Sequence, residues 1–137
     1  WLSSRPEPEA QNAVLAALND ADLDVQRNAL AALSKNPSPS ASLAVASVLA
    51  GSPAWPIRLE AARALGAMGT SAADARTLAA LAAAAERDKV PLVREAAARA
   101  ITAVAPEQAR PVLVRLKTAD PEVWVKESAA ALESTLP

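Results

Sequence analysis

Residues 88–101 read DKVPLVREAAARAI, and this segment decides the fold. Three other segments align with it: 20–33 (DADLDVQRNALAAL), 52–65 (SPAWPIRLEAARAL) and 120–132 (DPEVWVKESAAAL). Each has a β-branched residue near its centre, which we call the anchor, followed by an alanine four residues later. A leucine or isoleucine comes eight residues after the anchor, or seven in the last segment. Residues at this spacing share one face of a helix, so each segment predicts a helix with one apolar face.

The anchors are Val25, Ile57, Val93 and Val125, which lie 32, 36 and 32 residues apart. This period is typical of helical hairpins that stack into a solenoid. We expect the anchors and the apolar residues that follow them to form the core. The predicted core residues are Val25, Leu33, Ile57, Ala61, Leu65, Val93, Ala97, Ile101, Val125 and Leu132.

A second apolar stretch precedes each segment and predicts a further helix. These stretches cover 8–19, 39–50, 72–87 and 107–118. Pro111 would kink the last of them unless the regular helix begins there. Turn-forming residues predict turns near 20, 36, 52, 69, 88, 104 and 119. The sequence therefore predicts one domain over 1–137, without strands, made of eight antiparallel helices in four pairs: 7–35, 38–68, 71–104 and 106–136.

A short polar residue lies five positions before each anchor: Asp20, Ser52, Asp88 and Asp120. Such side chains can accept hydrogen bonds from the free N–H groups of a first helical turn, so we expect them to cap the second helix of each pair. Pro53 and Pro121 follow directly, which would place them in the first turn, where a missing N–H costs nothing.

The pattern Asp-x4-Val-Arg-x2-Ala-x2-Ala-Leu resembles the second-helix signature of HEAT repeats, especially the bacterial phycobilisome-lyase HEAT-like type. Residues 57–66 (IRLEAARALG) and 93–101 (VREAAARAI) match it closely, whereas Gln26 and Lys126 replace the arginine and Ser52 replaces the aspartate. The resemblance covers nearly the whole chain. It implies an all-α, right-handed α-solenoid of about four HEAT-like hairpins.

In function, the resemblance implies a protein-interaction scaffold, or a HEAT-repeat domain of a larger protein, that binds through its concave face. In such solenoids the second helices line that face. The candidate partner-binding residues are residues of these helices that avoid the apolar stripe, together with the two tryptophans just before an anchor: Trp55, Leu59, Arg63, Glu95, Arg99, Trp124 and Glu127. For Trp55 and Trp124 two roles stay open, because tryptophan is enriched in binding hot spots but also fills turns over a small-residue core.

The resemblance also implies a structural ladder that ties neighbouring repeats together. Its members here would be Asp20, Arg58, Asp88, Arg94, Asp120 and Lys126. A guanidinium offers a planar fork that fits a carboxylate. We therefore expect Arg58 and Arg94 to contact a carboxylate or a turn carbonyl of their own or the preceding repeat, Asp20 or Asp24 in the case of Arg58.

The composition argues against catalysis. The chain has no histidine and no cysteine, which are the commonest general base and a strong nucleophile. It has no glycine-rich phosphate loop and no cluster with metal-ligand spacing. We expect no enzyme activity, no cofactor and no metal.

Charge and hydropathy argue against two other classes of partner. There are 14 Lys and Arg against 15 Asp and Glu, a net charge of −1, so nucleic acid is an improbable partner on electrostatic grounds. Residues 36–57 carry no charge over about 20 residues, long enough to cross a bilayer. Four prolines interrupt them, so we expect a short helix between turns and no membrane insertion.

Two alternative functions remain open: chromophore attachment by a bilin lyase-type subunit, suggested by the resemblance, and DNA binding through a weakly basic concave groove. The sequence identifies no compartment, because lack of cysteine alone does not. The first residue is Trp1 and not methionine, so we expect the chain to be part of a longer one. We also expect contiguous apolar surface on at least one terminal helix pair.

Overall fold

A computed structural model describes the backbone of residues 7–137 and the side chains of residues 12–137. Within that part of the chain there are eight α-helices and no strand, which confirms the all-α prediction. The prediction of contiguous apolar surface at a terminal pair also rested on the opening Trp1-Leu2, which lies outside the described residues. The helices are α1 (Glu7–Leu18), α2 (Leu23–Lys35), α3 (Ser42–Gly51), α4 (Trp55–Met68), α5 (Ala75–Arg87), α6 (Pro91–Val104), α7 (Pro106–Ala119) and α8 (Val123–Ser134).

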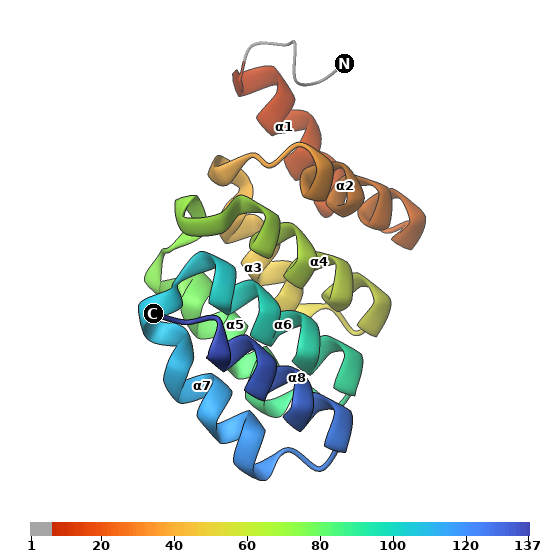
Figure 1. Ribbon diagram of the computed structural model, residues 1–137. Coiled ribbons are helices and arrows are strands. Elements are labelled where there is room, and N and C mark those ends of the chain that lie inside the picture. The colour runs from red at the N-terminus through yellow and green to blue at the C-terminus, as the bar shows by residue number, and fades with distance from the viewer. Residues whose placement is uncertain (1–6) are drawn as a thin grey trace.

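The helices form four pairs that stack in chain order, from α1–α2 at one end to α7–α8 at the other (Figure 1). The odd-numbered helices form one layer and the even-numbered helices the other, because α3 packs on α5 and α5 on α7, while α2 packs on α4, α4 on α6 and α6 on α8. We call these the first and the second layer. The architecture is thus a HEAT-like solenoid.

The second helices begin three residues after the predicted capping residues. Asp20, Asp88 and Asp120 each accept the backbone N–H two residues later, at 2.8 or 2.9 Å. This closes the turn between paired helices instead of capping the helix. The side chain that caps α2 is that of Asp22, which accepts the N–H of Asp24 at 2.8 Å. The capping prediction was therefore wrong, because these aspartates accept an N–H of the turn and not one of the first helical turn.

The prolines that follow two of the predicted capping residues also precede the helices. Pro53 and Pro121 lie in these turns, before the first residues of α4 and α8. The prolines that do occupy first helical turns in the second layer are Pro56 and Pro91. The prediction for Pro53 and Pro121 was wrong for the same reason as the caps.

Two first-layer helices, α3 and α5, begin three residues later than predicted. A 3-10 turn, Pro39–Ala41, precedes α3, and another, Gly69–Ala72, precedes α5. Asp74 caps α5 by accepting the N–H of Arg76 at 2.8 Å. Pro111 lies inside α7 instead of beginning it. Since Pro111 has no N–H, the carbonyl four residues earlier has no helical partner, and the exposed position of the ring leaves that carbonyl accessible to water.

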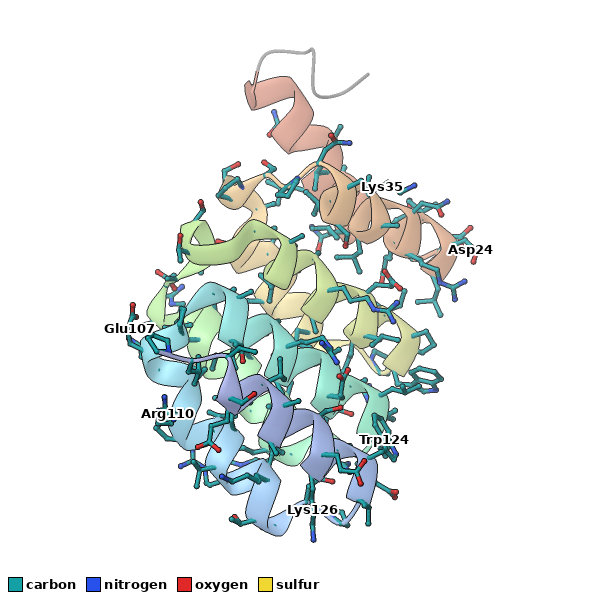
Figure 2. All side chains as sticks on the ribbon, viewed as in Figure 1. Asp24, Lys35, Glu107, Arg110, Trp124 and Lys126 are labelled. Atoms are coloured by element: carbon teal, nitrogen blue, oxygen red, sulfur yellow. The ribbon has the colours of Figure 1, made fainter. Side chains whose placement is uncertain are left out.

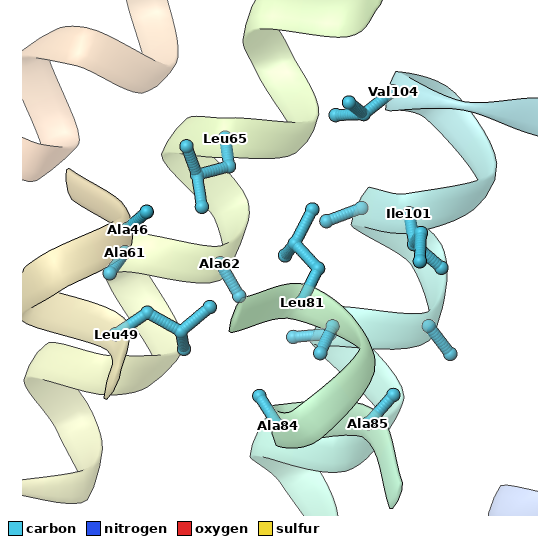
Figure 3. Close-up of a cluster of buried hydrophobic side chains, with 14 of the residues drawn as sticks. Ala46, Leu49, Ala61, Ala62, Leu65, Leu81, Ala84, Ala85, Ile101 and Val104 are labelled. Carbon is cyan, nitrogen blue, oxygen red and sulfur yellow. The ribbon is translucent and has the colours of Figure 1, made fainter. Parts of the chain in front are cut away.

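Most of the predicted core is buried: Leu33, Ile57, Ala61, Leu65, Val93, Ala97, Ile101 and Val125. Figure 3 shows Leu81 of α5 lying among side chains of α4 and α6. Val25 and Leu132 are less completely buried than the others, and Leu132 packs against the edge of the core. Val25 belongs to the first pair, which no preceding pair covers among the described residues. Leu132 follows its anchor by seven residues instead of eight, which turns it by about 100° around the helix.

Small residues set the spacing of the second layer. The contact between α4 and α6 is the most extensive of any two helices. A Cβ atom added to Gly66 of α4 would lie 3.2 Å from the Cα of Ala100 in α6. Because that is tighter than an ordinary van der Waals contact, glycine is the residue that lets the two backbones approach this closely.

The uncharged stretch 36–57 forms a 3-10 turn, the short helix α3 and the start of α4. None of the helices in the described part of the chain has the length and apolar character needed to span a bilayer.

Candidate functional site

Two buried or half-buried ion pairs connect successive repeats. The Nε and Nη2 atoms of Arg58 donate to the two carboxylate oxygens of Asp88, at 2.8 and 3.1 Å. Its Nη1 donates to the carbonyl of Ser52 at 3.0 Å. Arg58 therefore binds the turn of its own repeat and also the turn of the following repeat. We call such a contact a rung.

Arg94 repeats this geometry one hairpin later. It donates to both carboxylate oxygens of Asp120, at 2.8 and 3.1 Å, and to the carbonyl of Asp88 at 2.9 Å. The side chains of Arg94 and Asp120 are only 8% and 2% exposed. The bidentate fork and its burial make this the more enclosed of the two rungs.

Both arginines contact a turn carbonyl of their own repeat, as expected, but the direction of the rungs corrects the expectation of a partner in the preceding repeat. Arg58 contacts neither Asp20 nor Asp24 of the preceding repeat; its carboxylate partner, Asp88, belongs to the following one. Since Nη1 is held by the carbonyl of its own turn, the remaining edge of the guanidinium faces the next turn along the chain.

The two ends of the ladder lack rungs. Gln26 donates to the carbonyl of Asp20 at 2.5 Å, just as Arg58 and Arg94 donate to a carbonyl of their own turns. Its side chain has no guanidinium that could also bind a carboxylate of the next repeat. The position facing it in the next repeat is Ser52, whose hydroxyl accepts the N–H of Ala54 at 3.3 Å. Lys126 makes no hydrogen bond or ion pair among the described residues. The ladder therefore consists of two rungs, and Asp20 and Lys126 take no part in them.

The outer surface of the second layer carries pairs of opposite charge within single helices. Arg63 contacts Glu60 at 3.0 Å in α4, and Arg99 contacts Glu95 at 2.6 Å in α6. The two arginine side chains are 57% and 62% exposed. Because these contacts stay within one helix, they tie no repeats together and remain accessible.

Among the other candidates, Leu59 is partly buried and packs against the core, whereas Glu127 is exposed. Trp55 and Trp124 are each 41% exposed. The structure therefore leaves both tryptophans with a large accessible surface as well as a packed one.

Other large apolar side chains are exposed beside these tryptophans. They share one place, the first two residues of a second-layer helix: Leu23, Trp55, Leu92, Val123 and Trp124. Figure 2 places Asp24 of α2 and Trp124 of α8 at the same edge of the molecule. Sequence reasoning missed Leu23, Leu92 and Val123, although apolar residues one or two positions before every anchor could have indicated them. A contiguous apolar surface on a terminal pair stays a prediction.

A further set of ion pairs holds the first layer to its neighbours, and sequence reasoning missed it as well. Glu133 of α8 accepts a hydrogen bond from Lys117 of α7 and lies 3.6 Å from Arg110. The hydrogen bond from Lys117, followed by the positive charges of Lys117 and Arg110, lowers the pKa of the Glu133 carboxyl against a smaller opposing effect of desolvation. Arg115 of α7 pairs with Glu86 of α5.

A shallow groove of about 360 Å³ lies beside the Arg94–Asp120 rung. Its charged lining residues are Glu86, Asp88, Arg94, Arg115 and Asp120. Each is already in an ion pair, so the groove offers no free charged group for a ligand. In the described part of the chain no three acidic side chains come together as a metal site would need.

The comparisons agree with the repeat geometry. None of the curated proteins compared with the chain matches it significantly. The family model for HEAT repeats matches residues 11–101 and again residues 43–133. The starts of the two matches differ by 32 residues (43 minus 11), which is the spacing of the anchors Val25 and Ile57. The chain therefore belongs to the HEAT-repeat family, whose repeats generally serve as protein-interaction scaffolds.

Proposed function

We propose that the chain binds a protein partner through the outer surface of its second layer, which forms the concave face of the stack. Close packing supports the position of that face. In a curved stack of hairpins, the layer whose helices approach more closely lies on the inside of the curve. Here the α4–α6 contact is the most extensive, and Gly66 allows it.

The observation that carries the proposal is the difference between two sets of arginines. Arg58 and Arg94 are buried or half-buried and make contacts between repeats. Arg63 and Arg99 are mostly exposed and contact only a glutamate of their own helix. The second set is not needed to hold the stack together, so its charged groups are available to a partner.

The charge pattern favours protein over nucleic acid. Arg63 and Arg99 each have a glutamate beside them, so the surface of α4 and α6 presents alternating signs and not a continuous positive stripe. Nucleic acid binding draws its affinity from many unneutralised cations that displace counterions. A protein surface of mixed charge can complement both signs, with Leu59 and the two tryptophans as apolar contacts.

The test is a charge reversal. The variant Arg63→Glu/Arg99→Glu should lose its partner in affinity purification from the source cells, followed by identification and by measurement of Kd with the purified partner. The matched control is Arg76→Glu/Arg87→Glu, which reverses two exposed arginines of α5 in the first layer. Equal loss in both variants, or loss in neither, would refute binding through the second layer.

Two alternative functions are decided by separate assays. The phycobilisome-lyase-like signature of the second helices is the ground for testing bilin transfer to a phycobiliprotein. Steep salt-dependent retention on DNA or heparin would indicate a nucleic-acid partner. A positive result in either assay would contradict the scaffold proposal, which includes no catalytic step.

A further inference from the structure

The first turns of α4, α6 and α8 present a row of exposed apolar side chains, which we call the apolar strip. It consists of Trp55, Leu92, Val123 and Trp124, exposed by 41%, 46%, 66% and 41%. The first two residues of each of these three helices are apolar: Trp55-Pro56, Pro91-Leu92 and Val123-Trp124. A surface of this kind that recurs in every repeat indicates a binding site more than chance exposure.

The size of the strip selects the kind of partner. Large aromatic side chains offer about 150–250 Å² each, so the exposed parts of the strip amount to roughly 400 Å². A stable interface between folded proteins needs about 800 Å² on each side. The strip is therefore about half of what a second folded copy would need, whereas it suits a short linear segment.

The spacing of the helices favours a polyproline II conformation of that segment. Packed helices lie about 8–10 Å apart. A polyproline II chain rises about 3.1 Å per residue and returns to the same side every three residues, a repeat of about 9 Å. Every third residue would then lie over one helix of the strip. An α-helical ligand matches less well, because one turn rises only about 5.4 Å and two turns about 10.8 Å.

Two polar features complete the match. Neither indole N–H of Trp55 and Trp124 has a hydrogen-bond partner among the described residues, and the carbonyls of a polyproline II chain are free to accept. Beyond α4 the row continues at α2, where Asp22 and Asp24 are exposed on either side of Leu23 and form no ion pair with any residue whose side chain is described. A cation one period further along the ligand would lie beside these carboxylates.

We propose that the apolar strip binds a proline-rich segment in the polyproline II conformation, with prolines three residues apart over α8, α6 and α4 and a basic residue over Asp22 and Asp24. The proposal rests on the function proposed above, since both place a protein partner on the second layer. It concerns the edge of that layer, and its test replaces Trp55, Trp124 and Asp24 and not Arg63 and Arg99, so the two can fail separately.

The experiment uses synthetic peptides with the whole chain. The probe is a ten-residue peptide with arginine at position 1, alanine at 2, 5 and 8, and proline elsewhere; a second peptide carries the arginine at the other end, because polyproline II ligands can bind in either direction. One control peptide has glutamate in place of arginine. Another is an amphipathic helix of the same length. Calorimetry gives Kd, and the indole N–H signals of Trp55 and Trp124 report the site by NMR.

We expect one of the two arginine peptides to bind, and Trp55→Leu and Trp124→Leu each to weaken binding about tenfold. Asp24→Lys should weaken the arginine peptide and strengthen the glutamate peptide. The matched controls Leu43→Ala and Val114→Ala replace exposed apolar residues of the first layer and should leave Kd unchanged.

Three results would overturn the proposal: no binding by either arginine peptide, tighter binding of the helical peptide, or equal losses in the first-layer controls. Circular dichroism checks that each variant is folded. The variant Arg63→Glu/Arg99→Glu should bind the peptide normally, which separates this test from that of the concave face.

Discussion

The junction between the third and fourth hairpins and the junction between the first and second hairpins use the same two sequence positions differently. At the later junction Arg94 closes its own turn and also binds Asp120 of the next repeat. At the first junction Gln26 closes its own turn through Asp20, but Ser52 replaces the aspartate and no rung forms. The comparison separates two roles of the arginine: a shorter amide can close the turn, whereas only the guanidinium and its carboxylate can connect repeats.

The packing differs in the same direction. Six residues of α4 and eight of α6 are buried, against Leu30 and Leu33 in α2. The first hairpin therefore has both fewer buried side chains and no rung. We expect its junction to be weaker than the one between the second and third hairpins, where Arg58 forms a rung and α4 packs closely on α6, and the following changes test this difference.

The largest effect is expected when a rung loses only its cation. Arg94→Met should lower the free energy of unfolding by about 3–5 kcal/mol, because the Asp120 carboxylate stays buried without its partner. The matched change at the first junction, Gln26→Ala, removes one exposed hydrogen bond and should cost less than about 1 kcal/mol. Urea unfolding of both variants gives the two values.

A second substitution tests whether the buried charge is the cause. In the Arg94→Met background, Asp120→Asn removes the charge while its amide oxygen can still accept the N–H of Glu122. It should recover much of the lost stability. A double variant as unstable as Arg94→Met would show that lost packing dominates instead.

The next effect concerns the anchors of two neighbouring pairs. Ile57 is fully buried, and Ile57→Ala should cost about 2–5 kcal/mol. Val25 is only partly buried, so Val25→Ala should cost about 1 kcal/mol or less. Equal losses in denaturant melts would mean that Val25 is covered in solution and that the first hairpin is no weaker than the second.

A smaller effect, of opposite sign, is expected from building the missing rung. Gln26→Arg together with Ser52→Asp should stabilise the protein by about 1 kcal/mol and slow amide hydrogen exchange in α1 and α2. Each single change should have little effect, so the double-mutant cycle isolates the coupling. A coupling energy of zero would show that the first junction differs in backbone geometry as well as in side chains.

The smallest effect concerns the last pair, where Lys126 has no rung but Glu133 holds α7 to α8. The pKa of Glu133 is lowered from 4.5, so its charge stabilises the folded state above that pH, and this contribution is lost as the pH falls through the lower folded pKa. Glu133→Gln should therefore lower the melting temperature slightly at neutral pH, and the difference from the unmodified chain should shrink in acid. A constant difference across the titration would exclude an electrostatic origin.

The fold was predictable because the anchors and the alanines that follow them repeat in register over four segments. Because the four segments align at one period, each supports the assignment of the others, and a wrongly placed helix would not fit that period. The same reasoning could not decide whether a proline lies in a turn, at the start of a helix or inside one. Pro53 and Pro111 are equally compatible with a helix start in the sequence, but the first lies in a turn and the second inside α7, exposed to solvent.

The candidate site was predictable only in its residue types. The direction of the rungs was not, because Asp20 and Asp88 both belong to neighbours of the repeat that carries Arg58. Only the position of the guanidinium, with Nη1 held by Ser52, decides which neighbour it reaches. The apolar strip was missed for a different reason: Leu23 and Leu92 look like core residues in a helical pattern, and their exposure depends on where the helix begins.

The absent methyl group at Gly66 has a consequence for the shape of the whole stack. Adding it would push α6 away from α4 by a few tenths of an ångström, since the new Cβ would lie 3.2 Å from Ala100. The first layer would not move with it, so the displacement would become a rotation of one hairpin against the next. In a solenoid, a rotation between two hairpins displaces the hairpins further along the stack, and the displacement grows with distance. The residue type at position 66, near the middle of the chain, thus influences the angle between the second and third hairpins.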